Sequence, residues 1–85
     1  MAHYRIEIRV TPRPGILDPQ GKAIHHSLQN LGWTAVDDVR VGKAIHVEME
    51  AESEESARSE AEAMCRKLLA NPVTEDFEVY QVEEA

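Results

Sequence analysis

The stretch Pro14-Gly15-Ile16-Leu17-Asp18-Pro19-Gln20-Gly21, running on to Leu31-Gly32-Trp33, has the pattern of a loop followed by a short helix. Asp18 suits the N-cap, because its carboxylate can accept hydrogen bonds from the unpaired amides of a first helical turn. Pro19 then takes the first helical position, where a missing amide costs nothing. Gly32 suits the residue that follows a helix. The stretch therefore predicts a helix from Pro19 to Leu31, with one apolar face formed by Ile24, Leu28 and Leu31.

The segment before this helix has the alternation of a strand. From Tyr4 to Val10, apolar side chains occupy every second position and charged ones lie between them. A period of two places the apolar set on one face and the charged set on the other. Such a strand is typical of an antiparallel sheet covered on one side only.

Two more strands are expected after the helix, Thr34 to Val41 and Ala44 to Ala51, with a turn at Gly42. A strict two-residue loop would turn their apolar sets to opposite faces. We therefore expect a three-residue connection or a bulge near Gly42. The alternative is a hairpin with both faces partly covered, one by helices and one by another subunit.

A second helix and a last strand complete the chain. Ser53 can cap the helix, which ends before Asn71-Pro72. Its expected buried stripe is Ala57, Ala61, Met64, Cys65 and Leu68. In the strand Asp76 to Val82, Phe77 and Val79 oppose Tyr80 and Val82. A strand that is apolar on both faces would lie inside a sheet or meet another subunit.

The order of elements is thus β-α-β-β-α-β, the ferredoxin-like or split βαβ pattern. It predicts an α+β two-layer sandwich, with an antiparallel sheet and two helices on one face. Residues 1–85 leave room for a single domain. A chain this short buries a small core, so we expect it to form a homodimer or homotetramer.

Composition excludes several classes of function. The formal net charge of −7 argues against a nucleic-acid surface and against binding to an anionic membrane. One cysteine excludes an internal disulfide framework. No stretch is long and apolar enough to cross a bilayer and no signal peptide is recognisable, so a cytoplasmic location is expected.

No group of residues has the spacing of a catalytic or metal site. His25 and His26 are adjacent on the predicted helix and diverge by about 100°, which is unsuited to holding one ion. Asp37 and Asp38 would face opposite ways in a strand. Cys65 lies on an apolar stripe, where a buried structural thiol is expected. We therefore expect no catalytic residue, no bound cofactor and no metal, and a role in binding other proteins.

The run Gly15-Ile16-Leu17-Asp18-Pro19-Gln20-Gly21-Lys22-Ala23-Ile24 resembles the N-terminal signature of the PurS family, the small subunits of phosphoribosylformylglycinamidine synthase. Two later runs are also similar to that family, Asp38-Val39-Arg40-Val41-Gly42-Lys43 and Leu68-Leu69-Ala70-Asn71-Pro72-Val73. The resemblance implies a noncatalytic subunit that bridges a synthetase (PurL-like) and a glutaminase (PurQ-like) and supports ammonia transfer between them. ATP and Mg would then act on the synthetase subunit.

The resemblance also implies that the Gly15–Gly21 segment and its helix matter for shape or docking. Our candidate interface residues are Asp18, Gln20, Gly21, Trp33, Tyr80 and Val82. The alternative function is a small-molecule-sensing module of the ACT type, with a ligand pocket lined by residues between Thr11 and Leu17. Such a module pairs two domains of the same β-α-β-β-α-β pattern.

Overall fold

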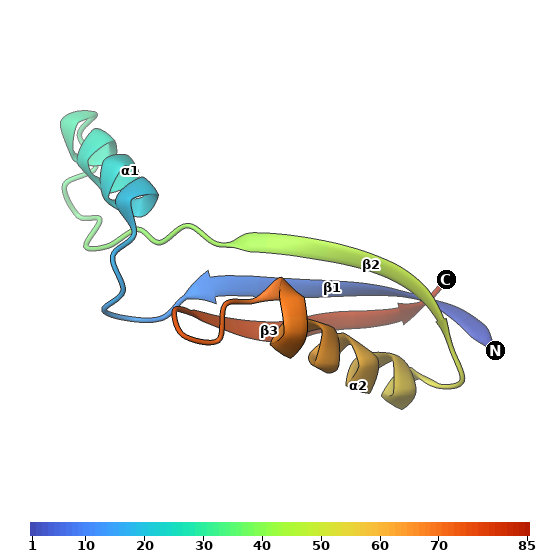
Figure 1. Ribbon diagram of the computed structural model, residues 1–85. Coiled ribbons are helices and arrows are strands. Elements are labelled where there is room, and N and C mark those ends of the chain that lie inside the picture. Colours follow the sequence, from blue (N-terminus) through green and yellow to red (C-terminus); the bar gives the residue numbers. More distant parts are fainter.

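The chain folds into one three-stranded antiparallel sheet and two helical segments (Figure 1). The computed structural model describes residues 1–85. In chain order the elements are β1 (Ala2–Pro12), α1 (Pro19–Asn30), β2 (Lys43–Ala51), α2 (Glu54–Met64), the π-helical turn η1 (Cys65–Leu69) and β3 (Glu75–Glu84). The sheet order is β2-β1-β3, so β1 lies in the centre and the other two strands are edges. The predicted α+β class is confirmed.

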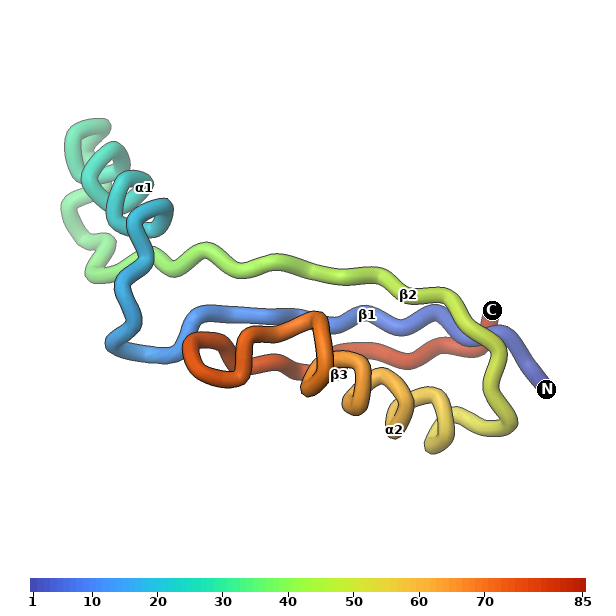
Figure 2. The backbone as a smooth tube through the Cα atoms, viewed as in Figure 1, coloured from blue at the N-terminus to red at the C-terminus, as the bar shows by residue number.

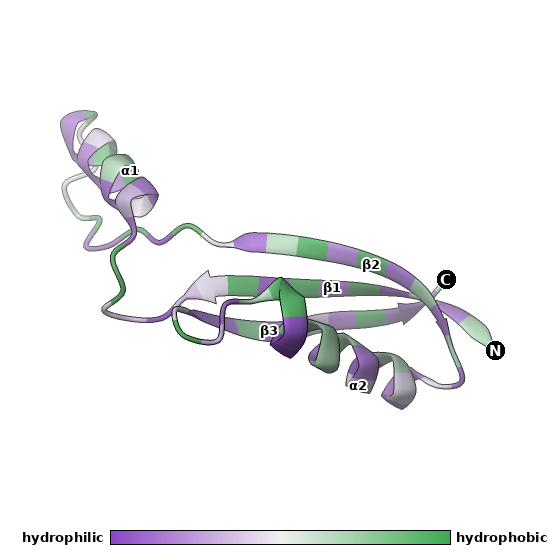
Figure 3. Ribbon diagram, in the orientation of Figure 1, coloured by the Kyte–Doolittle hydropathy of each residue, from purple (hydrophilic) through white to green (hydrophobic).

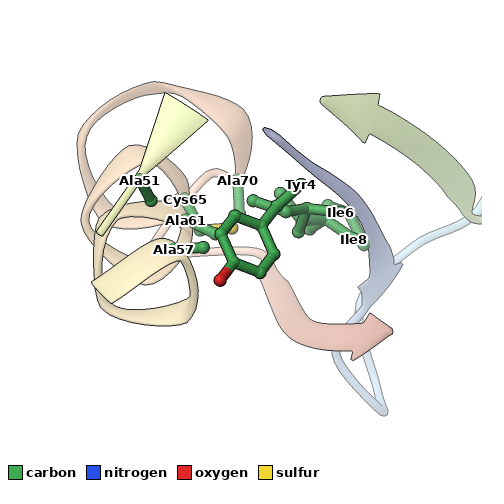
Figure 4. Close-up of a cluster of buried hydrophobic side chains, with 9 residues drawn as sticks. Tyr4, Ile6, Ile8, Ala51, Ala57, Ala61, Cys65 and Ala70 are labelled. Atoms are coloured by element: carbon green, nitrogen blue, oxygen red, sulfur yellow. The ribbon is translucent and has the colours of Figure 1, made fainter. Parts of the chain in front are cut away.

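The core lies between the central strand and α2. Four alternate side chains of β1 are buried on one face: Tyr4, Ile6, Ile8 and Val10. Small side chains of α2 and η1 are buried beside them: Ala57, Ala61 and Cys65 (Figure 4). Because these side chains are short, the helix backbone can approach the sheet closely. Ser53 caps α2 as predicted, since its hydroxyl accepts a hydrogen bond from the amide of Ser56 at 3.1 Å.

A β-bulge in β3 corrects the interpretation of the last strand. Glu7 pairs with Gln81 and Ile8 pairs with Val79, which leaves Tyr80 as an extra residue. An extra residue reverses the alternation of side chains along the strand. The apolar residues on both sides of the bulge therefore pack on the core: Phe77, Val79 and Val82. The strand is not apolar on both faces, and it lies at the edge of the sheet rather than inside it.

The bulge is connected to α2 by Arg58, which donates a hydrogen bond from Nη1 to the carbonyl of Val79 at 3.1 Å. Replacing Arg58 with alanine removes this bond. We expect Arg58→Ala to lower the free energy of unfolding by about 1 kcal/mol, as measured by urea titration. Glu54→Ala on the exposed face of the same helix is the matched control and should change it by less than about 0.5 kcal/mol. Equal effects of the two variants would contradict a role for the Arg58 bond.

The end of the second helix departs from the predicted buried stripe at two positions, Met64, which is only half-buried, and Leu68. Leu68 is 82% exposed, whereas Leu69 is half-buried and packs on the core. The cause is the wide turn η1, in which the amide of Ala70 donates to the carbonyl of Cys65, five residues earlier, at 3.1 Å. A π turn holds one more residue than an α turn, so it shifts the sequence of buried positions by one.

Two details of the predicted sandwich differ in the structure. The expected strand Thr34–Val41 has no partner in the sheet, and residues 36–42 run in an irregular path without a ladder. Only α2 covers the sheet, whereas α1 stands beyond its end (Figures 1 and 2). The Cα radius of gyration is accordingly 16.4 Å, against about 12 Å for a compact chain of this length.

The expected strand Thr34–Val41 stays unpaired because the chain does not reverse at Gly42. A side-chain carbon at this position would lie 2.5 Å from the carbonyl oxygen of Val10, so Gly42 lies flat against the end of β1. The chain therefore passes along β1 and into β2 without a turn. The predicted three-residue connection or bulge at Gly42 is not formed.

Candidate interaction surface

The segment from Ile16 to Val41 forms one unit that projects from the sheet, and we call it the α1 arm. Asp18 holds it together at the base. One carboxylate oxygen, Oδ1, accepts a hydrogen bond from the amide of Gly21 at 2.9 Å, and Oδ2 accepts from the amide of Val41 at 2.8 Å. The predicted N-cap is thus confirmed. The same side chain also links the start of α1 to the segment that leads into β2.

Further along the arm, α1 lies against the backbone of residues 36–41. His25 Nε2 is 2.8 Å from the carbonyl oxygen of Val36, which suits a hydrogen bond donated by the ring. Gly21 is buried, and a side-chain carbon there would lie 2.3 Å from the carbonyl oxygen of Val39. Helix α1 and residues 36–41 are therefore joined at three points along their length.

The arm exposes most of its apolar side chains. Five are classed as exposed, with Leu17 at 69%, Leu31 at 72% and Trp33 at 58% the most open; the others are Ile16 and Ile24. Figure 3 shows hydrophobic positions on the segments that flank α1, away from the sheet. The helix makes no extensive contact with any strand or with α2. A cluster of exposed apolar side chains on a small protein marks a site of interaction.

The structure divides the candidate interface residues into two regions. Asp18, Gln20, Gly21 and Trp33 belong to the arm, but Asp18 and Gly21 make bonds and contacts within it. Gln20 and Trp33 are exposed and available to a partner. Tyr80 and Val82 lie on the sheet, far along the chain from the arm, and are described next.

Tyr80 is on the uncovered face of the sheet, where the Arg9 guanidinium lies 3.3 Å from the centre of its ring. Glu7 accepts a hydrogen bond from Arg9 Nε at 3.0 Å, which helps to hold the guanidinium in this position. Val82, by contrast, packs on the core face with its side chain half-buried. Of the two sheet candidates, only Tyr80 is placed to touch a partner.

Sequence reasoning missed the contribution of Arg13 and of the apolar pair Ile16-Leu17. Arg13 Nη2 donates to the carbonyl of Pro72 at 2.7 Å, and its Nε lies 3.2 Å from Asp76 Oδ1. These bonds join the end of β1 to the loop before β3. The available signal was the pair of prolines around Arg13, which fixes the backbone near it. For Ile16-Leu17 the signal was two apolar residues just before a helix cap.

The pKa of the Asp18 carboxyl is lowered, first by the amide of Gly21 and then by that of Val41. Its stabilising effect is therefore present above the pKa of the unfolded state, about 4, and is lost as the pH falls through the folded-state pKa. We expect Asp18→Asn to loosen the arm at pH 7, and the difference from the wild type to disappear as the pH falls through the folded-state pKa of Asp18. The emission of Trp33, the only tryptophan, reports on the arm in both variants. A difference that persists unchanged at acid pH would contradict this origin.

No side-chain arrangement for catalysis is evident in the structure. Burial raises the pKa of the Cys65 thiol, which disfavours the reactive thiolate. No three His, Cys, Asp or Glu side chains come together in a way that could hold a metal ion. The depression beside Leu17 and Lys22 has a volume of about 360 Å³, but the carboxylate of Asp18 at its edge is already bonded to two backbone amides. The structure has no helix of the length and hydrophobicity that a membrane span requires.

Known proteins match the chain over nearly its whole length. A model of the PurS family, described as phosphoribosylformylglycinamidine (FGAM) synthase, matches residues 5–84. The PurS subunit of FGAM synthase from Synechocystis is 44% identical, over 100% of this chain and 88% of that protein. The corresponding subunit from Methanocaldococcus jannaschii is 41% identical, over 89% of this chain and 92% of its own.

Two solved structures are similar over the same extent. PurS from Thermus thermophilus aligns with a TM-score of 0.87 at 38% identity, covering 98% of both chains. A chain in the structure of PurLQS from Thermotoga maritima aligns with a TM-score of 0.83 at 36% identity, covering 100% of both. Alignment over this extent includes the arm as well as the sheet. This chain belongs to the PurS family.

Proposed function

We propose that this chain is the small, noncatalytic subunit of phosphoribosylformylglycinamidine synthase, a cytoplasmic complex of purine biosynthesis. The complex is an ATP-dependent and glutamine-dependent ligase that converts formylglycinamide ribonucleotide to formylglycinamidine ribonucleotide, with glutamate, ADP and phosphate as the other products. The observation that carries this proposal is the family match from residue 5 to residue 84.

The structure supports a bridging role within that complex. The charged sheet face around Tyr80 and Arg9 stays free when self-association covers the apolar side chains of the α1 arm, so an oligomer presents more than one copy of this face. A bridging subunit needs two such surfaces, because a synthetase and a glutaminase must be held at the same time. In this role the chain binds no cofactor, and ATP and Mg act on the synthetase subunit.

The test is to purify the synthetase and glutaminase with and without this chain, and to assay synthesis with either glutamine or ammonium as the nitrogen donor. Bridging predicts that omission abolishes glutamine-dependent synthesis and leaves ammonium-dependent synthesis nearly unchanged. Equal glutamine-dependent rates with and without the chain would overturn the proposal. So would turnover by this chain alone.

We also propose that the chain acts as a homodimer or a higher oligomer. Only 10 of its 85 residues are buried in the single chain, which is few for a domain of this size. Association would cover the exposed apolar side chains of the arm. Sedimentation equilibrium at low micromolar concentration tests this, because a stable monomer there would overturn it.

A further inference from the structure

A groove with a volume of about 550 Å³ lies beside η1 and the first residues of β3. Its floor is apolar, because Phe77 is half-buried there and Cys65 and Ala70 are buried and small. The other lining residues form its walls: Arg13, Arg66, Pro72, Glu75 and Asp76. None of them belongs to the α1 arm, so the groove is separate from the apolar surface of the arm.

Two exposed apolar side chains flank the groove. Leu68 is 82% exposed and lies between Arg66 and Ala70 in the chain. Val73 is 74% exposed and directly follows Pro72. Figure 3 shows hydrophobic positions both on η1 and on the loop that leads into β3. An apolar centre with charged groups around it is the usual arrangement of a protein–protein interface.

The backbone that carries both side chains is fixed. The π turn η1 turns Leu68 outward, as described above. In the loop, the amide of Val73 donates to Asn71 Oδ1 at 2.9 Å, and the amide of Asn71 donates to Glu75 Oε1 at 2.8 Å. The hydrogen bonds of Arg13 join the same loop to the end of β1. An ordered loop loses little conformational entropy on binding, so the exposed valine stands on a preorganised support.

Positive charge at the end of η1 is not fully neutralised within the chain. Lys67 takes part in no ion pair. Arg66 lies 3.5 Å from Glu62, with 64% of its side chain exposed. Arg13, in contrast, is held by Asp76 at 3.2 Å. A carboxylate on a partner would therefore be attracted to Arg66 and Lys67, next to the apolar floor.

We propose that this groove docks a segment of a partner protein that carries a large apolar side chain with a carboxylate beside it. The apolar side chain enters the groove over Phe77 and packs against Leu68 and Val73, and the carboxylate pairs with Arg66 and Lys67. The inference rests on the bridging function proposed above, because the segment belongs to one of the two larger subunits. It adds a docking surface to the charged sheet face.

A second copy of the chain does not fit this description. Its exposed apolar side chains are concentrated in the arm, where α1 contains no acidic residue. Asp18, next to Leu17, already accepts hydrogen bonds on both carboxylate oxygens. The arm therefore has no free carboxylate beside its apolar helix to pair with Arg66 and Lys67.

The test measures the affinity of the chain for the purified synthetase and for the purified glutaminase separately, by calorimetry. Leu68→Ser should weaken binding to one of them by about 10- to 150-fold, because the burial of a leucine side chain is lost. Leu68→Met is the matched control and should bind as the wild type does. Since position 68 is exposed in the single chain, both variants should keep the wild-type urea midpoint.

The charge of the rim is tested at Lys67. Lys67→Glu should weaken binding to the same subunit by about 2- to 10-fold at low ionic strength, and the loss should shrink in high salt. Lys67→Arg keeps the charge and should bind as the wild type does. Equal weakening by the two variants would overturn the pairing with a carboxylate.

The outcomes separate the groove from the proposed function. If the wild type binds a subunit and Leu68→Ser binds it equally well, the groove is not a docking site. If Leu68→Ser lowers the mass of the chain alone in sedimentation, the occupant is a second copy, which also overturns the inference. If the wild type binds neither subunit, the bridging function is wrong and the groove proposal with it.

Discussion

Ile8→Asp should prevent folding. Ile8 is 0% exposed and lies in the centre of β1, with Ile45 opposite on one side and Val79 on the other. The change loses about 1.5–3 kcal/mol of apolar burial. It also places a carboxylate without a partner in the core, at a further cost of several kcal/mol. A domain of this size has a total stability of roughly 4–13 kcal/mol, so the loss is comparable with the whole.

Circular dichroism and the dispersion of amide resonances measure this result, with an unfolded spectrum expected for the variant. Glu7→Asp is the matched control, because it introduces the same residue one position earlier, on the opposite face of the strand. It should retain the wild-type spectrum. A folded Ile8→Asp protein with a cooperative urea transition would show that the core is not organised around β1.

The parts of the fold that local signals control were predictable from sequence. Asp18 and Ser53 both cap the helices that follow them. Gly32 has a positive φ of 108° just after α1, as a helix-terminating glycine should. In each case the physical cause lies within three or four residues of the signal.

Departures from local regularity were harder to predict. The bulge at Tyr80 leaves a signal in the sequence, because the apolar positions change from odd to even numbers between Val79 and Val82. The same pattern also fits a strand covered on both faces. The wide turn η1 has no comparable signal. Leu68 and Leu69 are adjacent and identical, so their sequence does not show which one faces the core.

The position of the α1 arm depends on tertiary structure. An apolar stripe predicts that a helix face will be covered, but it does not specify by which surface or by which chain. The sequence therefore marked Asp18, Gln20, Gly21 and Trp33 as candidate interface residues but could not show that they share a unit that projects beyond the sheet. Asp18 and Gly21 belong to the run that resembles the family signature, and both make their contacts within the arm.

Gly21→Ala should disorder the arm although alanine favours helices. By helix propensity alone, the change would stabilise α1 by about 1 kcal/mol. A methyl group at this position would, however, lie 2.3 Å from the carbonyl oxygen of Val39 and 2.6 Å from Asp18 Oδ2. The first of these atoms is backbone and cannot move without displacing residues 36–41. Overpacking of this kind costs about 1–3 kcal/mol, so we expect steric repulsion to outweigh propensity.

Two measurements test the effect of Gly21→Ala. Hydrogen exchange at the amide of Val41, which is bonded to Asp18 in the wild type, should become faster. Self-association, which we propose to cover the exposed apolar side chains of the arm, should also weaken. Ser27→Ala, at an exposed position of the same helix, raises propensity without a clash and should leave both quantities unchanged. If Gly21→Ala instead protects Val41 and tightens association, the close packing of α1 on residues 36–41 does not govern the arm.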